Sequence, residues 1–236
     1  MPLFLPLGIA GLYRMWTDRR ILPVLGWGTA AVLVAIVAFA LAEPYAIIRS
    51  ERFLRDISEQ SHMVRNAGVF PYTTQYMHTP KYWYELQQMV LWGMAPLLGL
   101  TAVWATLRRI GSVVTARRPE EWILLSWVVP FFLVTGWFEV KFPRYLLPIY
   151  PLLILWAADW LIQRYRSGAL FGRIALPVVV LGTLAAATAF MTTYTRPHTV
   201  VTASEWVYRH VPAGSKILTQ DWDEGFPMPR PGYRAG

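Results

Sequence analysis

Long runs without a charged residue constrain this chain more than any other feature of its sequence. The clearest run extends from Ile21 to Ala42 and contains no Asp, Glu, Lys or Arg. A helix needs about 20 apolar residues to cross a bilayer, so this run predicts a membrane span. Further runs cover residues 86–107, 122–138, 145–163 and 174–195, with Asp159 as their single charge.

The composition agrees with a membrane protein. Hydrophobic residues make up 55% of the chain and charged residues 15%, and the mean hydropathy is +0.35; a soluble globular domain has a different balance. We therefore expect an all-α polytopic membrane protein with about five full transmembrane helices. The formal charge of +8 does not indicate nucleic acid as a partner, because the basic residues form short clusters between apolar runs.

The segments outside these runs predict smaller elements. Residues Met1 to Tyr13 form an apolar run below the roughly 20 residues of a span. We expect a truncated N-terminal helix there, and a chain that is a fragment or late-start form of a longer protein. Residues 46–67 place apolar and charged side chains at helical spacing, which predicts an amphipathic helix in the membrane interface, ended by Gly68.

The chain changes character from His198 onward. The pattern predicts a helix over Thr202–Arg209, capped by Ser204 or Thr202, and a strand over Lys216–Thr219. We expect two domains: a transmembrane helical domain over residues 1–196, with an outer loop at 43–85, and an incomplete extracytoplasmic α/β tail over residues 197–236.

The distribution of basic residues predicts the orientation in the membrane. Arg and Lys concentrate in the short loops 14–20, 108–121 and 164–173, and cytoplasmic loops carry such an excess. The loop 43–85, the segment 138–144 and the tail are then extracytoplasmic. These three regions, which hold the side chains that could bind a ligand or take part in catalysis, therefore share one face of the membrane.

A charged hinge separates two of the apolar runs. Glu139, Lys141 and Arg144 stand together there, among several prolines. Lys141 and the forked guanidinium of Arg144 suit the oxygens of a phosphate at the bilayer surface, and Tyr145 adds a hydroxyl. The alternative is that both cations only anchor the ends of spans by snorkelling, with Glu139 as an exposed partner.

The outer loop combines aromatic rings with polar tips. A sugar or lipid headgroup site there would use Tyr76, His78, Lys81 and Tyr84. The alternative is a membrane belt, because Trp and Tyr often gather at span ends. We predict no metal site: His62 and His78 have no second ligand at metal spacing, and the acidic group Asp221, Asp223 and Glu224 is typical of a solvated turn.

The sequence disfavours several classes of function. The predicted spans carry no charge near their centres, whereas proton relays, voltage sensors and ion-coupled carriers usually place ionisable groups there. No Ser/His/Asp arrangement, glycine-rich phosphate loop or cysteine pair is present.

Three segments resemble a known family. KFPRYLLPIYPLL, from Lys141, is similar to the basic-RY-LP-x-x-P hinge of the polyprenyl-phosphate-dependent glycosyltransferases of the C-type superfamily, the group containing protein O-mannosyltransferases and aminoarabinose transferases. QYMHTPKYWYELQQMVLWGMAPLLGL resembles the outer loop and following span of a bacterial and archaeal branch. TASEWVYRHVPAGSKILTQDWDEGFP resembles the opening of that branch's extracytoplasmic domain.

The resemblance implies a membrane glycosyltransferase in the plasma (inner) membrane of a prokaryote. It would transfer a sugar from a polyprenyl-phosphate donor to a lipid, glycan or protein acceptor, with Lys141 and Arg144 steadying the donor phosphate. Such enzymes carry an acidic catalytic residue in the first outer loop, and nothing here matches that loop. We expect the chain alone to lack the base and to be inactive, and no further cofactor is implied. A non-catalytic scaffold or lipid-binding module remains the alternative.

Overall fold

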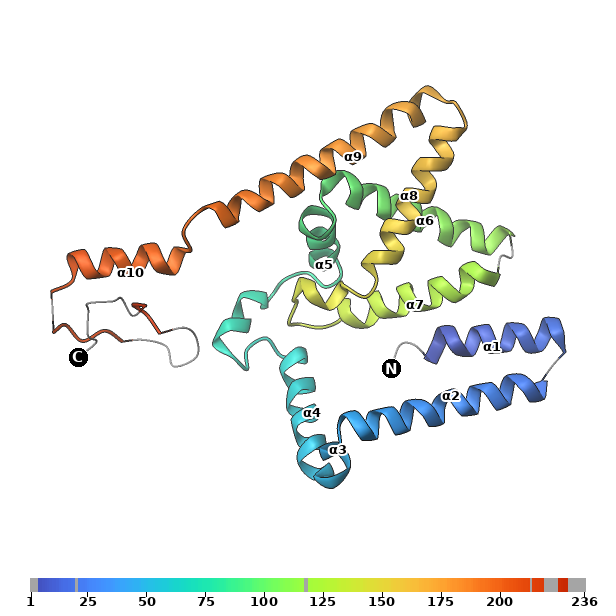
Figure 1. Cartoon of the computed structure of the whole chain (residues 1–236), viewed down its shortest axis with the longest axis horizontal. Helices are drawn as coiled ribbons and strands as arrows, with labels where there is room; N and C mark the ends of the chain where they lie inside the picture. Colours follow the sequence, from blue (N-terminus) through green and yellow to red (C-terminus); the bar gives the residue numbers. More distant parts are fainter. Residues whose placement is uncertain (1–3, 20, 117–118, 213, 219–224, 229–236) are drawn as a thin grey trace. The chain divides into compact units, whose positions relative to one another are not determined.

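The chain folds almost entirely into helices. A computed structural model describes residues 4–19, 21–116, 119–212, 214–218 and 225–228, and these ranges contain helices and no strand. The α-helices are α1 (Phe4–Asp18), α2 (Ile21–Ala42), α3 (Tyr45–Ile48), α4 (Ser50–Arg65), α5 (Trp83–Gln88), α6 (Pro96–Ala116), α7 (Pro119–Gly136), α8 (Tyr150–Arg166), α9 (Leu170–Met191) and α10 (Thr199–His210) (Figure 1). The all-α prediction is confirmed over the described residues.

The chain divides into two compact units, residues 1–183 and 184–236. In the first unit, α6 packs along α8, α7 contacts both α1 and α6, and α1 contacts α2. The core lies where α6, α7 and α8 meet, and Trp156, Leu146 and Ile149 are its largest fully buried side chains. These three helices therefore form the packed centre that positions the hinge.

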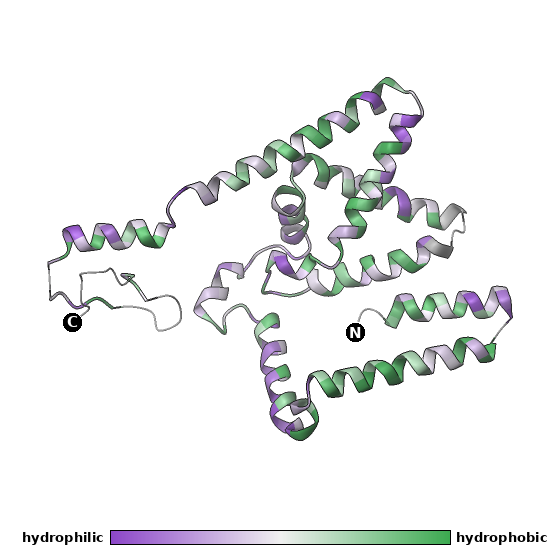
Figure 2. Ribbon diagram, viewed as in Figure 1, coloured by the Kyte–Doolittle hydropathy of each residue, from purple (hydrophilic) through white to green (hydrophobic). Residues whose placement is uncertain are grey.

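Two stretches of the described chain are long and apolar enough to cross a membrane. They are α2 and the stretch Leu170–His210, which begins with α9. None of the α2 side chains is buried, and its ribbon is coloured mostly as hydrophobic residues are (Figure 2). At about 1.5 Å per residue, α2 is about 33 Å long, which matches the apolar thickness of a bilayer.

The described residues thus contain two candidate spans, fewer than the five that the sequence predicts. The run 86–107 shows one reason. It does not form one helix: α5 continues into a π-helical turn at Met89–Gly93, and Ala95 then adopts a positive φ of 63° before Pro96 starts α6. Since proline has no N–H to give to the preceding turn, a helix begins readily at Pro96.

The two other missing spans are short. The apolar part of α7 covers only Glu121–Gly136. The run 145–163 begins in a 3-10 turn, Pro143–Leu146, so α8 starts only at Tyr150 and has 17 residues.

The predicted amphipathic helix is present in two pieces. Arg49, with φ −126° and ψ 52°, separates α3 from α4. The prediction that Gly68 ends the helix is wrong, because α4 ends at Arg65 and Asn66 is already extended. The apolar side chains of α4, such as Leu54 and Ile57, are exposed, as an interfacial helix requires.

The second unit differs from the predicted tail. His198 caps α10 by accepting a hydrogen bond from the backbone N–H of Val200 (3.4 Å), so neither Thr202 nor Ser204 is the cap. Ser204 instead accepts a bond from the N–H of Met228 (2.9 Å), which holds residues 225–228 against the helix. Lys216–Leu218 form no strand. Thr219, the last residue of the predicted strand, and the predicted acidic turn of Asp221, Asp223 and Glu224 lie outside the described residues.

Candidate functional site

The hinge is fastened to the last turn of α4 and to the residues that follow it. The backbone N–H groups of Glu139 and Val140 both donate to the carbonyl of Val64, at 3.0 and 3.2 Å. The Glu139 carboxylate in turn accepts a bond from the N–H of Ala67 (3.2 Å). Glu139 therefore binds backbone 72 residues away and is not the exposed partner that the snorkelling alternative requires.

Lys141 is buried beneath this connection. Its side chain is only 3% exposed; its ammonium donates to the hydroxyl of Thr79 (2.9 Å) and to the carbonyl of Glu139 (3.3 Å). Burial lowers the pKa of Lys141, and the nearby carboxylates of Glu85 and Glu139 partly offset this effect. Two of the three ammonium protons thus have protein partners.

Aromatic side chains from the loop and the hinge pack against one another. The ring of Tyr76 stands edge to face against Tyr84 (6.0 Å between centroids) and Phe142 (5.4 Å), and Phe142 packs in the same way against Tyr145 (5.5 Å). Tyr76 is buried, and this burial raises the pKa of its hydroxyl. The structure therefore brings three of the predicted loop and hinge residues, Tyr76, Tyr84 and Tyr145, into one cluster.

The remaining predicted residues are exposed. Arg144 lies over the ring of Phe142, with 4.2 Å from its guanidinium carbon to the ring centre, and its second aromatic neighbour is Tyr145 at 5.8 Å. The Lys81 ammonium lies over the ring of Trp137 at 3.9 Å. His78 is exposed and adopts a positive φ of 62°. Arg144 is thus the exposed cation of the hinge, and Lys141 the buried one.

A strained turn leads the loop into α5. Tyr82 has φ 62° and ψ −43°, and the N–H of Trp83 donates to the carbonyl of Lys81 at 2.6 Å. This bond and these angles define a γ-turn of the rare strained type, which costs on the order of 1–3 kcal/mol. The N–H of Tyr82 also donates to the carbonyl of Gly136 (3.3 Å), so the strain is held in place by the end of α7.

Glycine is required at the contact between this turn and α7. A Cβ atom on Gly136 would lie 2.5 Å from the ring of Tyr82, closer than two carbon atoms can approach without displacement. The glycine thereby lets the loop pack against the start of the hinge.

Glu85 belongs to this region, although no motif in the sequence points to it. It follows the strained turn on α5 and is only 5% exposed, and both of its carboxylate oxygens are buried without a hydrogen-bond partner among the described residues. Burial raises the pKa of Glu85, and the charge of Lys141 partly opposes the rise. The local sequence gave no signal for this residue, because its burial depends on the distant hinge.

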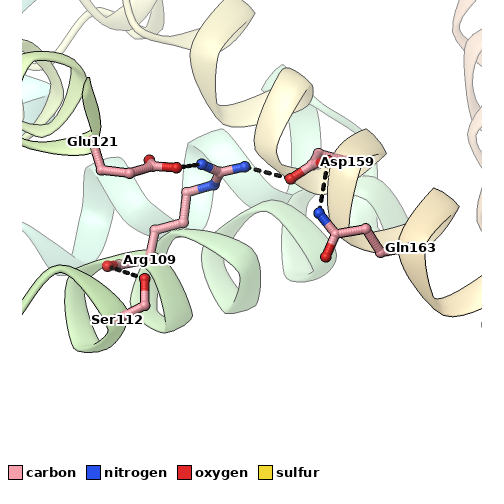
Figure 3. A network of polar contacts seen from close by, with 5 residues as sticks. All are labelled: Arg109, Ser112, Glu121, Asp159 and Gln163. Atoms are coloured by element: carbon pink, nitrogen blue, oxygen red, sulfur yellow. Dashed lines mark hydrogen bonds and ion pairs between the residues drawn. The ribbon is translucent and has the colours of Figure 1, made fainter. Parts of the chain in front are cut away.

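A second polar cluster joins the packed helices. Arg109 of α6 binds the carboxylates of Glu121 on α7 and Asp159 on α8, and Asp159 also accepts a bond from Gln163 at 2.8 Å (Figure 3). In the sequence, Arg109 is marked only as one of the basic residues of loop 108–121, and Asp159 only as the single charge of the apolar runs. Among the described residues, no three His, Asp or Glu side chains gather closely enough to hold a metal ion.

Comparisons with known proteins give no further guide to the site. We find no protein-family model, no curated protein and no solved structure with significant similarity to this chain.

Proposed function

We propose that this chain is part of a membrane glycosyltransferase that takes a sugar from a polyprenyl-phosphate donor at the extracytoplasmic face. The resemblance of the hinge, the outer loop and the tail to the C-type superfamily supports this proposal. The acceptor is a lipid, glycan or protein hydroxyl. Such a transfer needs a carboxylate to deprotonate the acceptor and cations to hold the departing phosphate, and the hinge supplies candidates for the second role.

The observation that carries the proposal is the exposed guanidinium of Arg144 on a firmly held hinge. The hinge is fixed by the bonds from Glu139 and Val140 to Val64, and Arg144 lies over aromatic rings. A guanidinium held in one place binds phosphate oxygens through paired N–H groups with little loss of side-chain freedom. In this proposal Arg144 and the Tyr145 hydroxyl contact the donor phosphate, and the buried Lys141 adds positive charge behind them.

The proposal includes a fuller membrane arrangement. The apolar helices α6, α7 and α8 lie in the membrane with α2 and α9, in the inner membrane of a prokaryote. The loop 43–85, the hinge and the tail face the extracytoplasmic side. The concentration of Arg and Lys in loops 14–20, 108–121 and 164–173 supports this orientation.

Binding of a polyprenyl phosphate tests the proposal. The purified full chain in detergent is titrated with polyprenyl phosphate and with the polyprenol of equal length, and the bound fractions are read by native mass spectrometry. We expect the phosphate to bind about tenfold more tightly than the alcohol. Arg144→Gln should abolish this preference, whereas Arg65→Gln, an exposed arginine at the end of α4, should preserve it. Equal binding of phosphate and alcohol by the unaltered chain would refute the proposal.

The second candidate function is a non-catalytic lipid-binding module. The exposed apolar side chains of α4, interleaved with charged residues, favour it, because such helices lie in membrane interfaces. This module would bind anionic vesicles through α4 and would not distinguish polyprenyl phosphate from other anionic lipids. The same titration with phosphatidylglycerol added as competitor separates the two functions.

A further inference from the structure

We propose that the cavity around Arg109 is a binding site for a phosphate ester that also carries a hydrogen-bond donor, such as the headgroup of a phospholipid. This site is independent of the proposed donor site at the hinge. Glu121 stands near the start of α7 and Gly136 at its end, so at about 1.5 Å per residue the two regions are about 22 Å apart along the helix.

The cavity is large enough for such a group. Its volume is about 470 Å³, and its lining comes from α6, α7 and α8. Among the lining residues are the three arginines Arg108, Arg109 and Arg164 and the two carboxylates Glu121 and Asp159. A phosphate headgroup is a compact polar object of the kind that a cavity lined by charged side chains accommodates.

The arrangement of charges leaves two cations for a ligand. Arg109 is already bound by both Glu121 and Asp159 (Figure 3). Arg108 and Arg164 form no ion pair with any residue that the structure describes. The cavity therefore holds an excess of positive charge on two forked side chains, and a phosphate is the anion whose geometry matches them.

Buried polar atoms without partners give an independent indication of a ligand. Trp156 is only 1% exposed, and its indole N–H has no acceptor among the described residues; the same holds for the buried indole N–H of Trp160. Both side chains line the cavity. Because an unpaired buried donor costs about 1–3 kcal/mol, these two N–H groups favour an occupant that supplies acceptor oxygens.

Glu121 indicates the second property of the ligand. Its side chain lines the same cavity. One carboxylate oxygen binds Arg109, and the other, Oε2, is buried without a partner in the part of the chain that the structure describes. A hydrogen-bond donor on the ligand, such as the ammonium of an ethanolamine or the hydroxyl of a glycerol, would satisfy this oxygen. A phosphate ester with such a donor matches all three groups of lining residues, the arginines, the tryptophans and the carboxylate of Glu121.

Lipid titration tests the proposal on the full chain in detergent. Native mass spectrometry compares phosphatidylethanolamine with a diacylglycerol of the same acyl chains, which lacks the phosphate. We expect phosphatidylethanolamine to bind about tenfold more tightly, and phosphatidylcholine, whose headgroup has no N–H or O–H donor, to bind more weakly. Equal binding of phosphatidylethanolamine and diacylglycerol would overturn the proposal.

Matched variants locate the binding. The double variant Arg108→Gln with Arg164→Gln should lose the preference for the phosphate. The control double variant Arg166→Gln with Arg173→Gln removes two exposed arginines that do not line the cavity, and it should keep the preference. An equal loss in both double variants would overturn the site and indicate a general charge effect.

A subtler variant keeps the test valid if the double variant unfolds. Trp160→Phe retains an aromatic ring and removes only the indole N–H, so it should weaken phosphatidylethanolamine binding a few-fold with unchanged diacylglycerol binding; no change in either would count against the site. Displacement by glycerophosphoethanolamine would identify a soluble ester as the occupant, and displacement by intact phospholipid alone would identify a lipid.

Discussion

The ammonium of Lys141 donates a hydrogen bond to the hydroxyl of Thr79 at 2.9 Å, and this bond connects positions 62 residues apart in the chain. Lys141 is therefore a structural link between the hinge and the outer loop, whatever ligand the hinge binds. The same ammonium also donates to the carbonyl of Glu139, so its removal leaves two acceptors without their donor.

Lys141→Met should destabilise the folded protein. The methionine fills a similar volume but donates no hydrogen bond, and it removes the positive charge beside Glu85. We expect a loss of about 1–3 kcal/mol, measured by thermal unfolding in detergent. Lys81→Met is the matched control: this exposed lysine contacts the ring of Trp137, and its loss should cost less than about 1 kcal/mol. Equal effects of the two substitutions would contradict the structural role of Lys141.

Glu85 should make stability depend on pH. Burial raises the pKa of its carboxyl from the ordinary 4.5, so the folded protein holds the proton more tightly than the unfolded chain. The resulting stabilisation is fully present below pH 4.5 and is lost as the pH rises through the pKa of the folded state.

Glu85→Gln isolates this effect, because glutamine resembles the protonated carboxyl at every pH. We expect the variant and the parent chain to differ little at acid pH, and the variant to become progressively more stable than the parent as the pH rises to neutrality. Unfolding midpoints of both proteins between about pH 4 and pH 8 provide the measurement. A difference that stays constant over this range would show that Glu85 is not buried as described.

Gly136→Ala should disturb the contact between the loop and α7. The added methyl group would lie 2.5 Å from the ring of Tyr82, and the ring cannot move away without displacing the strained turn. We expect a loss of about 1–3 kcal/mol. Gly28→Ala in α2 is the control, because a Cβ there meets nothing within 4 Å and alanine favours the helix by up to about 1 kcal/mol. Similar unfolding temperatures for the two variants would be inconsistent with the packing.

Arg109→Met should be among the most damaging substitutions in the first unit. It leaves the buried carboxylate of Glu121 without its counter-charge and removes the ion pairs that join α6 to α7 and α8. Since the Asp159 side chain is 42% exposed, we expect a loss of up to about 3 kcal/mol, at the low end for a broken buried pair. Arg166→Met, at the exposed end of α8, should stay within about 0.5 kcal/mol of the parent. Chemical denaturation of both variants decides whether the cluster supports the packed helices.

The sequence predicted the elements whose ends are marked locally. The bounds of α2 agree with the uncharged run from Ile21 to Ala42, because charged or polar residues stand at both ends of that run. The run 86–107 had no charge to mark its break. Pro96 was the available signal, but the π-helical turn before it and the positive φ of Ala95 arise from packing against α6 and the hinge.

The candidate site was predictable in its residue types and not in its burial. The hinge and the loop were selected because cations and aromatic rings stand in them. That Lys141 is buried and Arg144 is exposed depends on bonds to Val64 and Thr79, which no local pattern contains. Glu85 was missed for the same reason: its neighbours in the sequence are typical of a span entering the membrane.

The packing of α2 and α8 implies two different kinds of sequence constraint. No side chain of α2 is buried within this chain, so its residues need only be apolar and helix-compatible, and a shuffled order of the same residues would serve equally well. Along α8, Trp156, Ala157 and Leu153 are buried in the core, where shape matters as much as hydropathy. Mutational tolerance should thus change abruptly between two helices of comparable length.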